Sequence, residues 1–284
     1  AQILFTQLVK NRKELVMEKN KFIKSLLTGF ILLMSAQSAL SVPTTISDGY
    51  VGGDDNGYGD VIGDLNNFQI FDMDVSMTGT VLNVDISTNF AGKAGELFTG
   101  SITNYDGIGY GDLFLSGSWD PYPDGGAPYF EDDNITGTLW TYGLAIDDDV
   151  FNRFSNDNTI INASASLYQL NGTNDENALL SDDFLNNPTF RNGQEVAVDI
   201  SSGSTKDTGI DGTWSVSSSN DLVSFSIDLA GTGLEFSDEI ALHWGYTCAN
   251  DVIEGSYSVP EPDMIALLGI GLLGISISRR RRVK

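Results

Sequence analysis

The chain has 284 residues, of which 39 are acidic and 15 are basic, so its formal net charge is −24. An acidic field of this size repels nucleic acid and anionic membrane surfaces, and neither is an expected partner. The single cysteine excludes an internal disulfide, and the single histidine excludes a zinc site made from two or three histidines of this chain.

The N-terminal region predicts an export signal. Residues 17–41 start with Met17 and several lysines, continue through an apolar stretch and end in small residues. This layout is that of a secretory signal peptide. We place the cut after Ser41, with a cut after Ala39 as the alternative. Residues 1–16 precede the first methionine, and we interpret them as an upstream mis-start of the gene.

Residues 42–255 are predicted to form one acidic domain. Between the signal peptide and the C-terminal tail the chain keeps four basic and 35 acidic residues, a net charge of −31. Apolar and polar residues alternate with a period of two from Phe71 to Ile86, and again from Trp214 to Leu229. Each of these two segments contains a turn, so each predicts an antiparallel hairpin with one wet face.

Further strands are expected at 113–115, 139–146, 163–170, 195–200 and 240–244. No segment of the domain keeps a helical apolar period for three turns, and the 31 glycines are typical of a chain with many turns. We therefore predict an all-β fold, an antiparallel β-sandwich that is jelly-roll-like. A parallel β-helix is the alternative, although no fixed-period repeat is visible.

The loop before the first hairpin is the richest in aspartate. Its carboxylates and one amide alternate with glycines, which let the backbone bring several hard oxygen ligands to one point, as Ca²⁺ requires. An EF-hand loop needs a glutamate at its twelfth position, and the twelfth position counted from Asp54 is Leu65, so the loop is not an EF-hand. A solvated acidic loop is the alternative. If Ca²⁺ binds here as a cofactor, the candidate ligands are Asp54, Asp55, Asn56, Asp60 and Asp64.

The sequence favours a non-enzymatic protein with no catalytic residues. A Ser-His-Asp or Cys-His arrangement must use His243, which strand alternation places opposite Leu242 and Trp244, so we expect an accessible side chain. Cys248 is interpreted as a small buried hydrophobe. The alternatives are a secreted polysaccharide-active hydrolase with paired carboxylates, and a carbohydrate-binding module that stacks sugars on Trp119, Tyr122, Tyr129 and Trp140.

Residues 256–284 predict a membrane sorting tail, in which 256–262 is a tether. An apolar run over 264–278 is short for crossing a bilayer, because a stable transmembrane helix needs about 20 residues. A basic end, 279–284, follows it, and arginines beside a span stay on the cytoplasmic side, which places the domain outside the cytoplasm. The sorting residues are Val259, Pro260, Glu261, Pro262, Arg279, Arg280, Arg281 and Arg282.

This order of Val-Pro-Glu-Pro, short glycine-rich apolar segment and terminal arginines resembles the PEP-CTERM sorting signal of Gram-negative bacteria. The resemblance implies processing by an integral-membrane exosortase and an inner-membrane-anchored precursor. It also implies delivery to the cell surface or the extracellular biofilm matrix, with exopolysaccharide as a partner. Two further stretches, Gly107–Leu115 and Ala241–Ile253, resemble segments of exported proteins that carry the same kind of tail.

Overall fold

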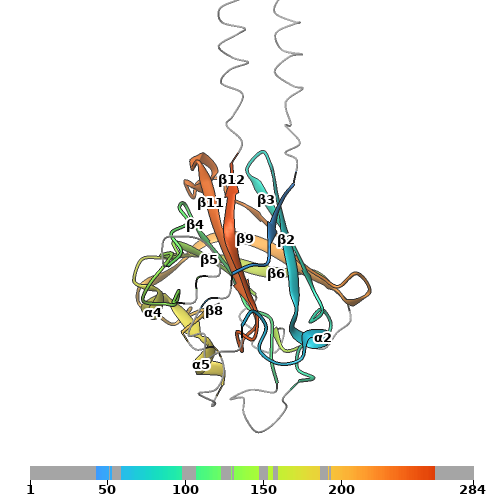
Figure 1. Cartoon of the computed structure of the whole chain (residues 1–284). Helices are drawn as coiled ribbons and strands as arrows, with labels where there is room; N and C mark the ends of the chain where they lie inside the picture. The colour runs from blue at the N-terminus through green and yellow to red at the C-terminus, as the bar shows by residue number, and fades with distance from the viewer. Residues whose placement is uncertain are drawn as a thin grey trace, which may run out of the picture. The chain divides into compact units, whose positions relative to one another are not determined.

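In a computed structural model of the chain, the described residues are 43–50, 52, 59–97, 107–122, 129, 131–146, 153–155, 159–185, 191 and 193–259. They form an all-β, antiparallel fold, as predicted. Ten strands make one sheet in the order β1-β2-β3-β10-β9-β6-β5-β4-β11-β12, and β7 and β8 make a second, two-stranded sheet (Figure 1).

The elements have the following bounds: β1 Thr44–Ser47, α2 Leu65–Phe68, β2 Ile70–Thr78, β3 Val81–Thr88, β4 Leu113–Ser116, β5 Tyr142–Ile146, β6 Thr159–Leu170, α4 Asn174–Asn177, β7 Ala178–Leu180, α5 Ser181–Phe184, β8 Glu195–Val198, β9 Thr205–Ser217, η1 Ser218–Asn220, β10 Leu222–Asp228, η2 Leu234–Phe236, β11 Glu239–Gly245 and β12 Val252–Ser258.

Both predicted hairpins are present, as β2–β3 and β9–β10. Their alternating apolar residues are buried, because a pleated strand turns every second side chain to the same face. Phe71 is an exception. A register shift between Ile70 and Asp72 turns Ile70 inward and leaves Phe71 49% exposed.

The first and last strands of the large sheet approach each other. β1 and β12 are in contact, and Gly255 of β12 lies so close to β1 that a Cβ there would stand 2.6 Å from Ile46 Cγ2. The sheet is therefore nearly barrel-like, whereas we expected two packed sheets. Alternation fixes which face of a strand is buried, but it does not fix strand order. The register shifts in the long β6–β9 pair also bend the sheet.

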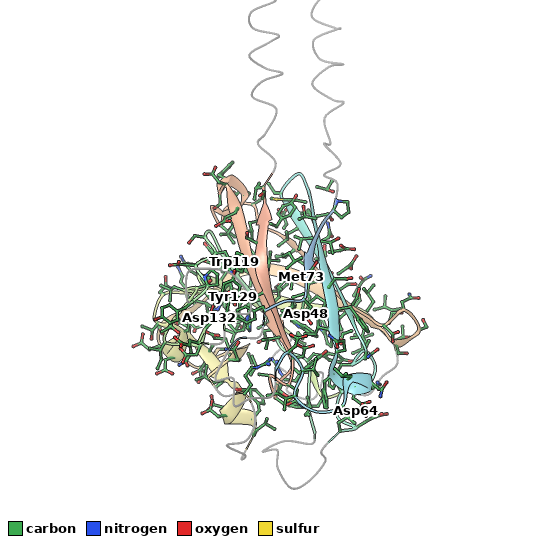
Figure 2. The ribbon with its side chains drawn as sticks, in the orientation of Figure 1. Asp48, Asp64, Met73, Trp119, Tyr129 and Asp132 are labelled. Atoms are coloured by element: carbon green, nitrogen blue, oxygen red, sulfur yellow. The ribbon has the colours of Figure 1, made fainter. Side chains whose placement is uncertain are left out.

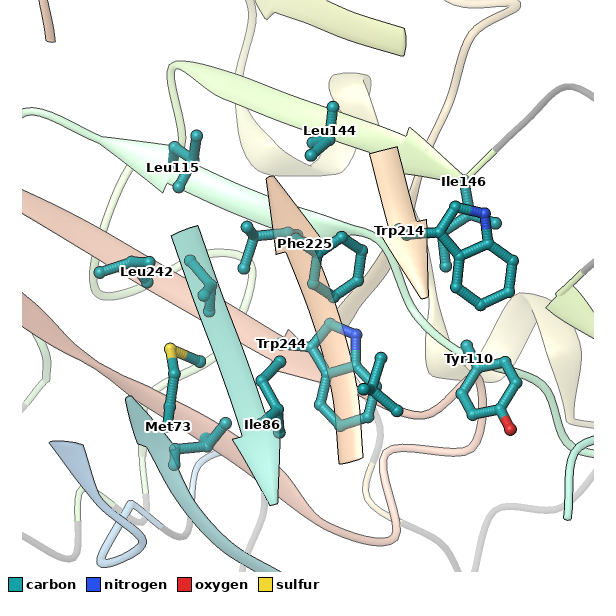
Figure 3. Close-up of a cluster of buried hydrophobic side chains, with 14 of the residues drawn as sticks. Met73, Ile86, Tyr110, Leu115, Leu144, Ile146, Trp214, Phe225, Leu242 and Trp244 are labelled. Carbon is teal, nitrogen blue, oxygen red and sulfur yellow. The ribbon is translucent and has the colours of Figure 1, made fainter. Parts of the chain in front are cut away.

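The interior of the sheet is filled by large side chains from distant strands. Trp244 of β11, Trp214 of β9 and Phe225 of β10 are at most 2% exposed and lie in one cluster (Figure 3). Trp244 Nε1 donates to the Gly111 carbonyl at 3.0 Å, so the ring's polar group is satisfied. Two smaller clusters of buried hydrophobic residues, around Phe114 and around Val196, lie outside this one.

A buried ion pair fastens β8 to the edge of this core. Arg153 Nη2 lies 2.9 Å from Asp112 Oδ1, and the Asp112 carboxylate also accepts from the backbone N–H groups of Ile146 and Val198. Burial raises the pKa of Asp112, although Arg153 and these hydrogen bonds oppose the shift. The pair places β8 beside β5 and thereby positions Glu195, the first residue of β8.

The last strand extends into the segment that we expected to be a tether. Ser256–Ser258 belong to β12, and the Val259 N–H donates to the Asp238 carbonyl at 3.0 Å. Among the residues that the structure describes, no helix is long and apolar enough to cross a membrane. The proposed mis-start, signal peptide and transmembrane segment, residues 1–16, 17–41 and 264–278, lie outside the described residues.

Candidate functional site

The two stretches that resemble segments of other exported proteins lie side by side. Ala241–Ile253 forms most of β11, a buried turn and the start of β12, and Gly107–Leu115 leads into β4, the neighbour of β11. The Gly111 N–H donates to the Gly245 carbonyl at 2.9 Å, and a Cβ at Gly111 would stand only 2.4 Å from that carbonyl oxygen. Position 111 therefore requires glycine, and the contact holds the β11–β12 hairpin, which contributes to two clusters of buried polar side chains.

The first cluster, called the acidic triad below, consists of Asp48, Asp60 and Asp251. One carboxylate oxygen from each residue lies within 4.8 Å of the other two. Asp251 is fully buried, and its two oxygens accept from the N–H groups of Ile70, at 2.6 Å, and of Val252, at 3.0 Å. These bonds hold one carboxylate rigidly where the other two converge.

Arg191 is the cation next to the triad. Its guanidinium is 1% exposed and donates to the backbone carbonyls of Gly59, Asp60 and Ala249. It thus ties the loop that carries Asp60 to the turn that carries Asp251. One guanidinium offsets only one of three carboxylates.

The triad favours bound protons in its metal-free form. Burial, followed by the charge of Asp60, raises the pKa of Asp48 to about 8. Burial also raises the pKa of Asp60, and burial with the charge of Asp48 raises the pKa of Asp251 well above its usual value. Three carboxylates at this spacing cannot all stay ionised without further positive charge.

The second cluster, called the histidine cluster below, consists of His243, Glu254, Glu195 and Asp132. His243 Nδ1 lies 3.1 Å from Glu254 Oε2, and His243 Nε2 lies 2.8 Å from the Glu195 carbonyl oxygen. Because a carboxylate and a carbonyl can only accept, both ring nitrogens must carry protons to satisfy both contacts. The geometry therefore favours the charged imidazolium form of His243.

The pKa shifts of the histidine cluster agree with this geometry. Burial lowers the pKa of His243, but the hydrogen bond and charge of Glu254, together with Glu195, outweigh it and the net shift is upward. Burial, with the charge of Glu254, raises the pKa of Asp132 to about 8. Burial raises the pKa of Glu195 to about 7.

The side-chain polar atoms of His243 and Glu254 are all bonded, whereas Glu195 Oε1 is buried without a hydrogen-bond partner among the described residues. Glu254 Oε1 accepts from Trp119 Nε1 at 2.8 Å and from Thr138 Oγ1 at 3.3 Å. Asp132 Oδ2 accepts from the Tyr122 N–H, at 2.9 Å. A network of this kind fixes the surrounding loops in place.

Our expectation that His243 would be accessible is wrong. His243 is fully buried, because β8 and the segment around Trp140 cover the face of β11 that we assigned to solvent. Cys248 is also fully buried, and burial raises the pKa of its thiol to about 12, so it is a poor nucleophile. The two residues do not form a Cys-His pair of the kind that enzymes use, since both His243 nitrogens bond elsewhere.

The proposed Ca²⁺ ligands separate in the structure. Asp54, Asp55 and Asn56 lie outside the described residues. Asp64 Oδ1 accepts from the Asn66 N–H at 3.0 Å and caps α2, apart from Asp48 in Figure 2. Asp60 does join a carboxylate cluster, but its partners are Asp48 and Asp251, which we did not list as ligands.

The four aromatic residues that we considered for sugar stacking differ in exposure. Trp140 is 2% exposed and packs on His243 with ring centroids 5.5 Å apart, so it is not available. Trp119 and Tyr129 are half-buried and lie edge to face at 5.7 Å, with Asp132 in the same region (Figure 2). Tyr122 is 43% exposed.

Comparison with known proteins gave a family match for the C-terminal segment alone. The PEP-CTERM protein-sorting motif matches residues 258–282, which confirms the predicted sorting tail. Of the predicted sorting residues only Val259 is described; Pro260, Glu261, Pro262, Arg279, Arg280, Arg281 and Arg282 lie outside the described residues. Neither the curated proteins nor the solved structures gave a match. The chain is thus an all-β protein with a motif that indicates export and sorting by an exosortase.

Proposed function

We propose that the protein is a non-enzymatic component of the cell surface or extracellular matrix of a Gram-negative bacterium, released from an inner-membrane precursor by an exosortase and associated with exopolysaccharide. The observation that carries the proposal is the position of the sorting motif. The match begins at Ser258, the last residue of β12, and Val259 is still bonded to the fold. All of the described fold except Ser258 and Val259 therefore precedes the motif, as expected of cargo carried by a sorting tail.

The polar clusters support a structural role for the domain over a catalytic one. His243, Glu254 and Glu195 are at most 5% exposed, and most of their polar atoms bond within the fold. A general acid or base must reach the proton that it transfers, directly or through one water. Groups enclosed in this way serve to hold loops together.

Replacing Pro260, Glu261 and Pro262 by alanine tests the sorting proposal. We expect the variant precursor to accumulate in the inner membrane, because the two prolines interrupt the helix and leave an extended segment for a membrane peptidase. The native mature protein should begin near Val42, end near Pro260 and lack residues 264–284. Intact-mass measurement on surface protein and on membrane fractions reads out both outcomes.

The matched control is the pair Ser219→Ala and Asn220→Ala, in an exposed turn of the domain. This variant should be processed and delivered normally. A surface-located species that still carries Arg279 to Arg282 would show that the tail is a permanent anchor. Normal delivery of the alanine-substituted tail would reject the sorting role of the motif.

Carbohydrate binding is a second candidate function, favoured by the exposed Tyr122 and by the half-buried Trp119 and Tyr129, whose rings lie 5.7 Å apart. Exposed aromatic faces stack on sugar rings. Tyr122→Ala should weaken retention of the protein on the polysaccharide of the producing cell, whereas Phe236→Ala, which removes an 81% exposed ring, should not. Equal retention of both variants and the native protein would reject this site, and release of sugars would reveal a hydrolase.

A further inference from the structure

The acidic triad joins three segments that are far apart in the sequence. Asp48 follows β1, Asp60 lies in the loop before α2, and Asp251 closes the turn before β12. Their converging oxygens lie within 4.8 Å of one another. Oxygens that surround Ca²⁺ at about 2.3–2.6 Å are at most about 5 Å apart, so one ion can touch all three.

Unsatisfied polar atoms at this place point to a missing ligand. Asp48 Oδ1 and Asp60 Oδ1 are screened from water and accept no hydrogen bond from the described residues. Asn250, next to Asp251, is fully buried, and neither its Oδ1 nor its Nδ2 has a partner among those residues. Its Nδ2 lies 3.5 Å from where a Cβ of Gly63 would stand, so the amide faces the loop that carries Asp60. Buried polar groups are rarely left unpaired, because each unmade hydrogen bond leaves the cost of desolvation uncompensated.

The charge of the site favours a bound cation once its carboxylates ionise. The three carboxylates carry −3 when ionised, and Arg191 supplies +1, which leaves −2. Arg191 gives its hydrogen bonds to backbone carbonyls. Asp48 Oδ2 accepts from Gln69 Nε2 at 3.4 Å, and both Asp251 oxygens accept from backbone N–H groups, so Asp48 Oδ1 and Asp60 Oδ1 are the oxygens without a partner among the described residues. A divalent cation would neutralise the remaining charge.

We propose that Asp48, Asp60 and Asp251 bind one Ca²⁺ ion, which fastens β1 and the loop before α2 to the turn before β12. The donors are all hard oxygens, which Ca²⁺ prefers, whereas zinc prefers nitrogen and sulfur. The site depends on the folded domain alone. The calcium proposal is tested independently of the proposed surface role, because the sorting experiment alters only the tail.

Calcium binding is tested on the full chain purified in mild detergent and stripped with EDTA. Titration calorimetry with CaCl₂ at pH 8 should show one site. At a hundredfold excess of Ca²⁺ over its dissociation constant, the melting temperature should rise by about 5–10 °C. The double variant Asp48→Asn and Asp60→Asn should lose both responses, yet melt in EDTA at or above the native temperature, since it removes carboxylate repulsion. Asp64→Asn, which keeps the cap of α2, is the matched control and should respond normally.

The proposal is overturned if native protein shows no calorimetric signal with CaCl₂, or if the double variant keeps the native response. An equal rise in melting temperature with NaCl at matched ionic strength would also overturn it, because it would reflect screening of the acidic surface. Should the double variant fail to fold, Asp60→Asn alone decides the matter: it must weaken Ca²⁺ binding at least tenfold. A larger response to MgCl₂ than to CaCl₂ would reject the choice of ion.

Discussion

Replacing His243 by alanine should destabilise the domain strongly. The substitution removes the partner of Glu254 Oε2, at 3.1 Å, and of the Glu195 carbonyl oxygen, at 2.8 Å. It leaves a buried carboxylate without its counterion, and breaking a buried pair in this way costs about 3–5 kcal/mol. From strand alternation alone we would expect at most about 1 kcal/mol, the value for a side chain outside the core. A buried ion pair and a side chain outside the core therefore predict losses of unfolding free energy that differ by enough to be measured.

The cost should also depend on pH. The pKa of His243 is raised in the folded state, so its contribution to stability is fully present below about 6.5, the unfolded value. That contribution is lost as the pH rises through the folded pKa. The difference in free energy of unfolding between native protein and His243→Ala should therefore be larger at pH 6 than at pH 9.

Urea denaturation at both pH values, followed by tryptophan fluorescence, measures these differences. His243→Gln is the companion variant, because its amide can donate to one of the two acceptors and should recover part of the loss. Ser258→Ala, at an exposed position of β12, is the control and should change stability by less than about 0.5 kcal/mol. A loss below 1 kcal/mol for His243→Ala at both pH values would refute the imidazolium pair.

Three further results are expected. With EDTA present, the melting temperature measured by calorimetry should fall as the pH rises from about 5 to 8. The pKa values of Asp132 and Glu195 are raised to about 8 and about 7, so the folded state binds more protons than the unfolded state in this pH range. A melting temperature that rises with pH would contradict this prediction. Gly255→Val should cost about 1–3 kcal/mol in urea titrations, since its Cβ would meet Ile46, and an unchanged midpoint would show that β1 is not seated on β12. Cys248 should react with a thiol reagent only after unfolding, and rapid labelling of the native protein would contradict its burial.

Local sequence patterns predicted much of the secondary structure. The hairpins β2–β3 and β9–β10 follow from alternation over at least seven residues each, a signal that needs no knowledge of other strands. The sorting motif is likewise a local pattern. Strand β12 was missed because Gly255 takes the position between Ile253 and Tyr257 where alternation requires an apolar side chain.

The acidic triad depends on the order of strands in the sheet, which the sequence alone does not reveal. Asp48 and Asp251 are 203 positions apart and meet only because β1 and β12 are the two ends of one curled sheet. The excess of acidic residues also hid the site, since 35 carboxylates in the domain make every acidic loop a candidate. Burial separates the groups: Asp251 is fully buried, whereas Asp64 is exposed and caps a helix.

The hairpin β11–β12 explains why the two clusters and the sorting tail occur together. It carries His243 and Glu254 on its strands and Asp251 in its turn, and its last residue begins the sorting motif. β12 pairs with β11 alone and packs on β1, so this edge of the sheet has fewer hydrogen bonds than a central strand. The imidazolium pair, and Ca²⁺ at the acidic triad, would each add attachment at this edge. Among the described residues, two clusters of buried charges thus meet at the hairpin that leads into the sorting motif.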